Sequence, residues 1–90
     1  MDVDELLAMQ LGAFSDRALA LEFHRRHVRQ LPDLRIDKTR DARGQFLYKV
    51  RTGSYVNPAL ARTDARELAR RLDLEVIVAE LAADGGSGSD

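Results

Sequence analysis

No cysteine or tryptophan occurs in the 90-residue chain, and only 6% of its residues are aromatic. The lack of cysteine excludes disulfide bonds, thiol catalysis and cysteine-ligated zinc sites. No apolar stretch approaches the roughly 18 residues that a membrane-spanning helix needs. The acidic opening segment 1–5 shows no sign of an export signal. A chain of 90 residues suffices for one domain with a small core, which excludes a two-domain enzyme with an interdomain cleft.

The charged residues are unevenly distributed, although the formal net charge is only −1. All 14 Lys and Arg residues lie between Arg17 and Arg71, together with six of the 15 acidic residues, so this stretch carries a net charge of +8. A basic middle segment is able to attract an anionic polymer. The competing interpretation is that the arginines form the polar outer stripes of two amphipathic helices.

Composition divides the chain into three parts. We expect residues 1–5 to be a lead-in, residues 6–82 to form the domain, and residues 83–90 to be a flexible Gly/Ser tail.

Within the domain a five-residue motif occurs twice, as QLGAF from Gln10 and as RTGSY from Arg51. Each copy combines a polar residue, an apolar or β-branched residue, Gly, a small residue and an aromatic. The repeat, with a period of about forty residues, indicates an internal duplication.

Alternating apolar and polar residues predict four strands. We expect these strands over residues 7–13, 34–39, 46–51 and 75–79. The turn-forming segment 41–44 joins the second strand to the third as a hairpin.

Helical spacing of apolar residues predicts two helices between these strands. Ser15 is expected to cap the first helix, with Asp16 in its first turn, and Pro32 ends it after Leu31. The dipeptide Asn57-Pro58 predicts the start of the second helix, because proline suits the first helical position. Residues 63–64 are a second candidate start, and this helix is expected to run to residue 72.

The resulting order β-α-β-β-α-β predicts an α+β fold of the ferredoxin-like, split βαβ type. This RNP-like sandwich has a four-stranded antiparallel sheet with both helices on one face, which leaves the other face open. Alternation then assigns residues to the two faces. The inward-facing set is Met9, Leu11, Ile36, Tyr48, Val50, Val76 and Val78, packed on Ala20, Phe23, Ala65, Leu68 and Leu72. The open-face set is Gln10, Arg35, Asp37, Leu47, Lys49, Arg51 and Ile77.

The predicted open face mixes hydrogen-bond donors with small apolar surfaces. Gln10, Lys49 and Arg51 supply the donors, and Leu47 and Ile77 supply the apolar surfaces. Such a mixture suits a neutral or weakly anionic polymer that carries hydroxyl and acetamido groups. The competing interpretation is an inert, solvated sheet face with scattered apolar residues.

The two motifs, at this spacing and in this element order, resemble those of a SPOR domain (sporulation-related repeat). The first strand of that family carries a similar Gln-apolar-Gly-small-aromatic sequence, here Gln10 to Phe14. Its third strand carries a Tyr-basic-Val-x-x-Gly sequence, here Tyr48 to Gly53. The resemblance covers residues 7–80, nearly the whole predicted domain.

The resemblance implies a non-catalytic module that binds peptidoglycan, in particular glycan strands stripped of their peptides. Such modules target a larger protein to the bacterial division septum, so the implied location is the cell envelope or periplasm at the division site. A chain complete as given would stay in the cytoplasm. The implied state is a monomeric domain of a larger envelope protein, without cofactor or metal. We expect neither a nucleic-acid partner nor membrane contact by this chain.

Six residues are implied as glycan-binding by the resemblance: Gln10, Ala13, Leu47, Lys49, Arg51 and Ile77. Ala13 stands where some members carry Ser, Leu47 where some carry an aromatic residue, and Lys49 where Arg is more usual. Either Lys49 or Arg51 is suited to pair with the lactyl carboxylate that remains on the sugar once the peptide is removed.

Two other binding functions are alternatives. RNA binding is one, because RRM domains share this topology, but it requires aromatic side chains on the open face, whereas Phe46 and Tyr48 are predicted to point inward. Protein interaction is the other, through the arginine-rich helix faces. Those faces comprise Arg25, Arg26 and Arg29 on the first helix and Arg66, Arg70 and Arg71 on the second.

His24 and His27 form the candidate metal pair, since three residues on a helix separate them. No acidic residue at ligand spacing accompanies them, so a packing role is the preferred interpretation. The sequence also contains no nucleophile–base arrangement and no glycine-rich phosphate loop, so catalysis by this chain is not expected.

Overall fold

A computed structural model describes residues 6–81 of the chain. The expected lead-in (1–5), the expected Gly/Ser tail (83–90) and residue 82, the last of the predicted domain, lie outside the described residues. Six elements follow one another in the predicted order β-α-β-β-α-β. They are β1 (Leu7–Phe14), α1 (Arg17–His27), β2 (Arg35–Arg40), β3 (Phe46–Tyr55), α2 (Pro58–Leu72) and β4 (Ile77–Glu80).

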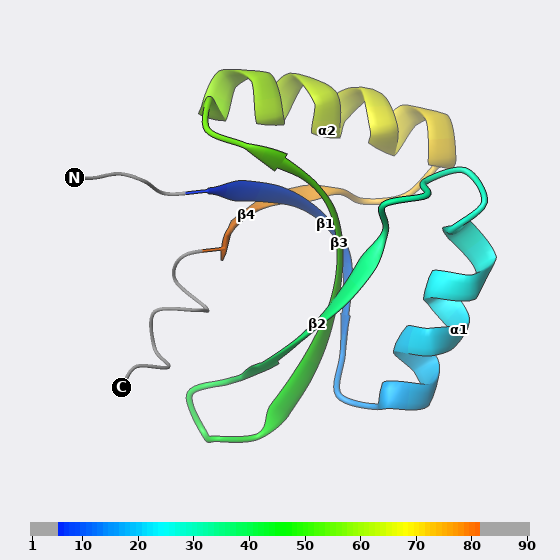
Figure 1. Cartoon of the computed structure of the whole chain (residues 1–90), viewed down its shortest axis with the longest axis vertical. Helices are drawn as coiled ribbons and strands as arrows, with labels where there is room; N and C mark the ends of the chain where they lie inside the picture. Colours follow the sequence, from blue (N-terminus) through cyan, green and yellow to red (C-terminus); the bar gives the residue numbers. More distant parts are fainter. Residues whose placement is uncertain (1–5, 82–90) are drawn as a thin grey trace.

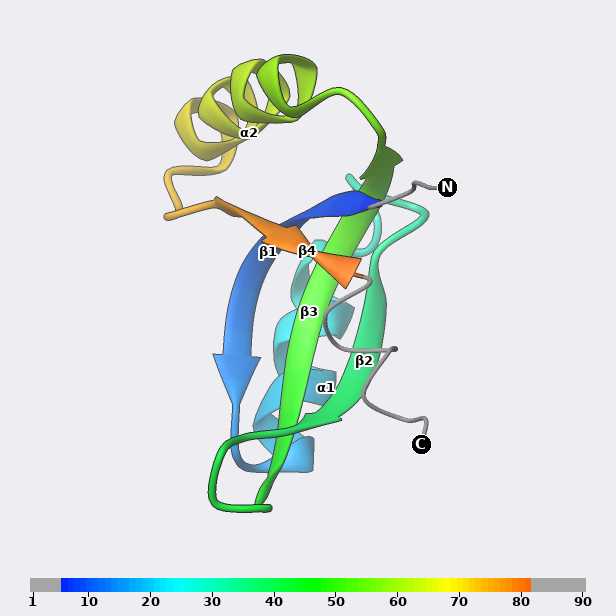
Figure 2. The same ribbon diagram turned by 90° about the vertical axis from the view of Figure 1, so that its left-hand side faces the viewer.

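The strands form one antiparallel sheet in the order β2-β3-β1-β4, which confirms the predicted ferredoxin-like α+β fold. The sheet is strongly bent, and α1 and α2 both lie on its convex side (Figure 1). Turned by 90°, the molecule shows α1 behind β3 and β2 (Figure 2). The concave face therefore carries neither helix, and β1 and β3, which bear the two copies of the motif, run through its middle.

The helix boundaries differ from the predicted ones at α1 and agree at α2. Asp16 rather than Ser15 caps α1, because its Oδ1 accepts a hydrogen bond from the Ala18 N–H at 2.8 Å. The helix ends at His27, and the following turn places Leu31 in the core without continuing the helix. At α2, Asn57 is the N-cap and Pro58 the first helical residue, as predicted.

The core lies between the convex face of the sheet and the two helices, and every residue of the predicted inward set takes part in it. Val50, at the centre of β3, and Ala20, on α1, are completely buried. Tyr48 is half-buried against this core. Phe46 is a partial exception: it lies on the same side of β3 as Tyr48, but it is 41% exposed near the tip of the hairpin. There its ring is flanked by Lys38 and Arg40 on β2.

The two copies of the motif are also equivalent in space. Each forms an irregularity in the β1–β3 pairing at its glycine, and Gln10 of the first copy pairs directly with Arg51 of the second. A Cβ on Gly12 would lie 2.9 Å from the ring of Phe14, and a Cβ on Gly53 would lie 2.9 Å from the ring of Tyr55. Glycine thus allows each aromatic ring to fold back over its own strand. The aromatic residues then contact different helices: Phe14 packs on Phe23 of α1 and Tyr55 hydrogen-bonds to Asp64 of α2.

Tyr55 is expected to ionise later than an ordinary tyrosine. Burial, the 2.7 Å hydrogen bond that its hydroxyl donates to Asp64 and the negative charge of Asp64 raise its pKa from 10.0 to about 12. Because this pKa is raised, the stabilisation from the neutral hydroxyl is complete below about pH 10 and is lost as the pH rises towards 12. Absorbance titration of a Tyr48→Phe variant, which retains Tyr55 as its single tyrosine, should give a midpoint near 12. A midpoint at 10 would contradict the bond to Asp64.

Candidate functional site

A row of side chains crosses the concave face over all four strands. Gln10 on β1 is opposite Arg51 on β3 and opposite Ile77 on β4. Arg51 in turn is opposite Arg35 on β2. Since directly paired residues point to the same side of a sheet, these four side chains are neighbours on the face that the helices leave uncovered.

A second row follows one step along the strands. Lys49 on β3 is opposite Asp37 on β2 and opposite Ala13 on β1. Leu47 lies one further step towards the hairpin, opposite Thr39. The structure therefore gathers five of the six predicted residues over β1, β3 and β4, and places Leu47 at the hairpin end of the same face.

A shallow depression of about 270 Å³ lies beside the first row. Its lining residues are Gln10, Leu11, Gly12, Ala13, Glu75 and Ile77. The apolar part of the lining is well exposed, because Ile77 is 49% accessible. Gly12 and Ala13 have little or no side chain, so the β1 side of the depression is not filled. The depression thus combines an amide, a carboxylate and an apolar wall.

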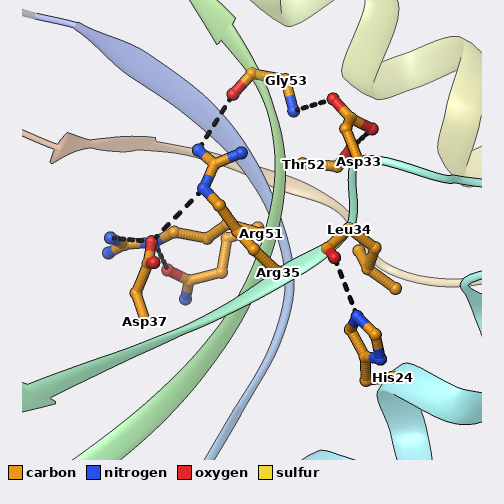
Figure 3. A network of polar contacts seen from close by, with 9 residues as sticks. His24, Asp33, Leu34, Arg35, Asp37, Arg51, Thr52 and Gly53 are labelled. Atoms are coloured by element: carbon orange, nitrogen blue, oxygen red, sulfur yellow. Dashed lines mark hydrogen bonds and ion pairs between the residues drawn. The ribbon is translucent and has the colours of Figure 1, made fainter.

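Arg51 differs from the expectation of an exposed basic residue, because only 2% of its surface is accessible. Its Nε–H donates to Gln10 Oε1 at 3.0 Å. Its terminal nitrogen Nη1 lies 3.3 Å from Asp37 Oδ2 (Figure 3). The same Asp37 oxygen is 3.8 Å from Nε of Arg35. A long side chain lying along a concave sheet is covered by its neighbours, and pairing with Asp37 offsets the cost of burying its charge. Arg51 therefore holds other residues of the site in position.

The bond to Arg51 fixes the orientation of the Gln10 amide. A guanidinium Nε–H can only donate, so the amide oxygen of Gln10 faces Arg51. The NH2 of Gln10, which can only donate, is then the part of the amide directed away from Arg51. Because Gln10 also lines the depression, this site presents a hydrogen-bond donor there.

A second polar cluster connects the C-terminal part of β3 to the segment before β2. Asp33 accepts hydrogen bonds from the Thr52 hydroxyl and, at 3.2 Å, from the Gly53 N–H (Figure 3). Arg35 donates to the Gly53 carbonyl at 3.0 Å. The hydrogen bond from Thr52 is the main cause that lowers the pKa of Asp33. Burial opposes the shift in part, and the Gly53 N–H and the charge of Arg35 add to it.

Asp33→Asn is expected to cost about 1 kcal/mol of unfolding free energy at pH 7, since it weakens charge-assisted hydrogen bonds at a largely exposed position. The lowered pKa of Asp33 means that its stabilisation is complete above 3.8, the ordinary pKa, and is lost as the pH falls below it. Urea denaturation should therefore show a difference between variant and wild type at pH 7 that shrinks towards pH 2. An equal difference at both pH values would contradict the role of the carboxylate.

The two histidines of α1 have structural partners on the convex side. Nε2 of His24 lies 2.8 Å from the Leu34 carbonyl, so it carries the proton and ties α1 to the start of β2 (Figure 3). The ring of His27 lies 4.6 Å from that of Phe23, centre to centre. Within residues 6–81, no group of three or more His, Asp or Glu side chains is arranged to hold a metal ion. Neither helix of this range is long and apolar enough to cross a membrane.

Sequence reasoning missed two members of the site. Glu75 lines the depression and is not among the six predicted residues. It precedes Ile77 by two residues on an alternating segment, which is the signal in the sequence that places both on one face. Asp37 was placed on the open face, but its pairing with Arg51 could not be read from spacing, because the two residues are 14 positions apart on different strands. The aromatic residues Phe46 and Tyr48 belong to the convex face, so the described part of β3 offers no aromatic platform of the RRM kind.

Comparison with known proteins supports this topology. The family model for the SPOR domain matches residues 5–84. Among solved structures, the chain is similar to the peptidoglycan-binding domain of the B. subtilis cell wall lytic enzyme CwlC, with 24% sequence identity and a TM-score of 0.60. The match covers 89% of this chain and 94% of that domain. No curated protein matches the sequence. Because the family model spans all of the described residues, the chain belongs to the SPOR domain family.

Proposed function

We propose that this chain is a non-catalytic module that binds peptidoglycan glycan strands on its concave face. The observation that carries the proposal is the row of Gln10, Arg51 and Ile77 beside the depression on a face that the helices leave uncovered. Membership of the SPOR family and the likeness to a peptidoglycan-binding domain support it. The six predicted residues Gln10, Ala13, Leu47, Lys49, Arg51 and Ile77 form the proposed binding surface, with Arg51 acting through Gln10.

The chemistry of the surface fits a saccharide chain. The Gln10 NH2 donates to an acetamido carbonyl or hydroxyl oxygen, Glu75 accepts from a hydroxyl, and Ile77 packs against the apolar face or methyl group of a sugar. Lys49 is suited to pair with a lactyl carboxylate, a group that becomes charged only after the peptide is removed. Each exposed contact contributes about 1 kcal/mol or less, so several contacts along one chain must act together.

A shallow depression favours bare glycan over glycan with attached peptides, because a peptide on the lactyl group would need a deeper site or would crowd the sheet. The resemblance to SPOR domains implies targeting to the division septum, so we propose that this domain acts there in the bacterial envelope. There it would serve as a monomeric targeting domain of a larger envelope protein.

Cosedimentation with purified sacculi tests the proposal. The protein should sediment with sacculi treated with an amidase that removes the peptides, and several-fold less with untreated sacculi. Lys49→Glu should reduce binding to treated sacculi several-fold, whereas Arg25→Glu, the same charge reversal on the exposed surface of α1, should leave it unchanged. Equal sedimentation of wild type and Lys49→Glu would show that Lys49 does not contribute to binding. If the wild type did not sediment with treated sacculi, glycan binding would be refuted.

A further inference from the structure

A groove of about 570 Å³ lies between α2 and β4, on the convex side of the sheet. Its floor is apolar and consists of Ala65 and Ala69 on α2 and Val76 and Val78 on the strand side. The two alanines are one helical turn apart on the same side of α2. Because their methyl groups do not fill the space above the valines, the groove remains open.

The strand beside this groove, β4, is an edge of the sheet. The Leu81 N–H donates to the Leu6 carbonyl at 2.8 Å, which makes this pair a hydrogen-bonded one. Pairing alternates along antiparallel strands, so Ala79 and Ile77 also bond to β1. The main-chain groups of Val78 and Glu80 therefore point away from β1, towards the edge that no other described strand covers.

The helical rim of the groove is basic. Arg62, Arg66 and Arg70 are spaced by four residues along α2, all three are exposed, and the first two line the groove. This spacing places them in one stripe on the same side of the helix. The single acidic residue in the lining is Glu75, on the strand side.

We propose that the β4 edge and the α2–β4 groove together bind an extended, acidic peptide segment of a partner protein, which adds to the sheet as a fifth strand. The main chain of this segment would pair with Val78 and Glu80. Of its side chains on the convex side, apolar ones would occupy the groove and acidic ones would reach Arg62 and Arg66. The groove and the glycan surface lie on opposite faces of the sheet and share one lining residue, Glu75.

Charge favours such a partner over a second copy of this chain. Two copies joined edge to edge at β4 through a two-fold axis perpendicular to the sheet would bring both stripes of Arg62, Arg66 and Arg70 to the same side of the joint sheet, where they repel one another. An acidic peptide neutralises the stripe instead. The short edge of β4 limits the number of main-chain hydrogen bonds, so the expected affinity is micromolar to millimolar.

The test uses a short labelled peptide in which every second residue is threonine and the residues between alternate between valine and glutamate. NMR titration of the ¹⁵N-labelled domain should shift the amide signals of Val78 and Glu80 and those of the groove, with saturation below about 1 mM. The same peptide with lysine in place of glutamate should bind at least about fivefold more weakly. Arg66→Glu should weaken binding of the acidic peptide to a similar extent, and Arg71→Glu, on the other side of α2, should not.

Three results would overturn the proposal: no shift at about 1 mM peptide, equal affinity for the acidic and lysine peptides, or shifts confined to the concave face. Concentration-dependent shifts at β4 without peptide, together with a dimer in light scattering, would assign the edge to a second copy instead. Sacculus binding by Arg66→Glu should equal that of the wild type, so a failure here is distinguishable from a failure of the glycan proposal.

Discussion

Gln10→Glu is expected to reduce binding to peptide-stripped sacculi by about tenfold or more without destabilising the domain. One carboxylate oxygen still accepts the hydrogen bond from Arg51 Nε, now as an ion pair, so unfolding free energy should stay the same or rise. The other oxygen replaces the NH2 at the depression. It cannot donate a hydrogen bond, and it repels a lactyl carboxylate.

The matched control is Gln45→Glu, the same substitution at an exposed residue of the β2–β3 turn. It changes the net charge equally and should bind treated sacculi as the wild type does. Urea denaturation of both variants separates a binding defect from a folding defect. If Gln10→Glu sedimented like the control, the orientation derived for the amide would be wrong.

Gly53→Val should produce the largest loss of stability, about 3 kcal/mol or more, with a fall in Tm of more than about 12 °C. Gly53 has φ +82°, a conformation that a β-branched residue strongly disfavours. A Cβ there would also lie 2.9 Å from the ring of Tyr55 and 3.6 Å from Cε of Met9. Relief of the contact would move Tyr55 away from Asp64.

Gly44→Val isolates the backbone part of this effect. Gly44 has the same φ of +82°, but no atom lies within 4 Å of the position that its Cβ would take. The Gly44→Val variant should therefore lose only about 1–2 kcal/mol of unfolding free energy, which is the cost of the left-handed conformation. Calorimetry or urea denaturation at pH 7 makes the comparison. Equal losses at the two positions would show that the packing of Tyr55 over Gly53 contributes nothing.

Much of the fold was predictable from local patterns. Period-two alternation in 34–39 and 46–51 identified the hairpin, and Asn57-Pro58 identified the start of α2. The error at α1 has a physical cause, because Ser15 and Asp16 are both good capping residues and only the backbone conformation decides between them. The end of α1 was also missed: apolar spacing continues to Leu31, but the chain leaves the helix after His27 and still buries Leu31 in a turn.

The site was less predictable than the fold. Alternation placed Gln10, Lys49 and Ile77 on one face, and the register places them close together. It could not reveal that Arg51 is buried, because burial depends on the curvature of the sheet and on the partner at Asp37. Irregular pairing at the two glycines also shifts one strand against the other, and a simple count of residues does not contain that shift.

The near-symmetry of the two motif copies bears on how a linear sugar could lie on this domain. Two identical halves would offer a saccharide chain no preferred direction. Here the symmetry is broken at its centre, because the first copy presents the Gln10 amide at the depression whereas the second copy buries its Arg51 guanidinium against that amide. A glycan has distinct reducing and non-reducing ends, so it would meet different chemistry in its two orientations. It would therefore bind the domain in one preferred direction.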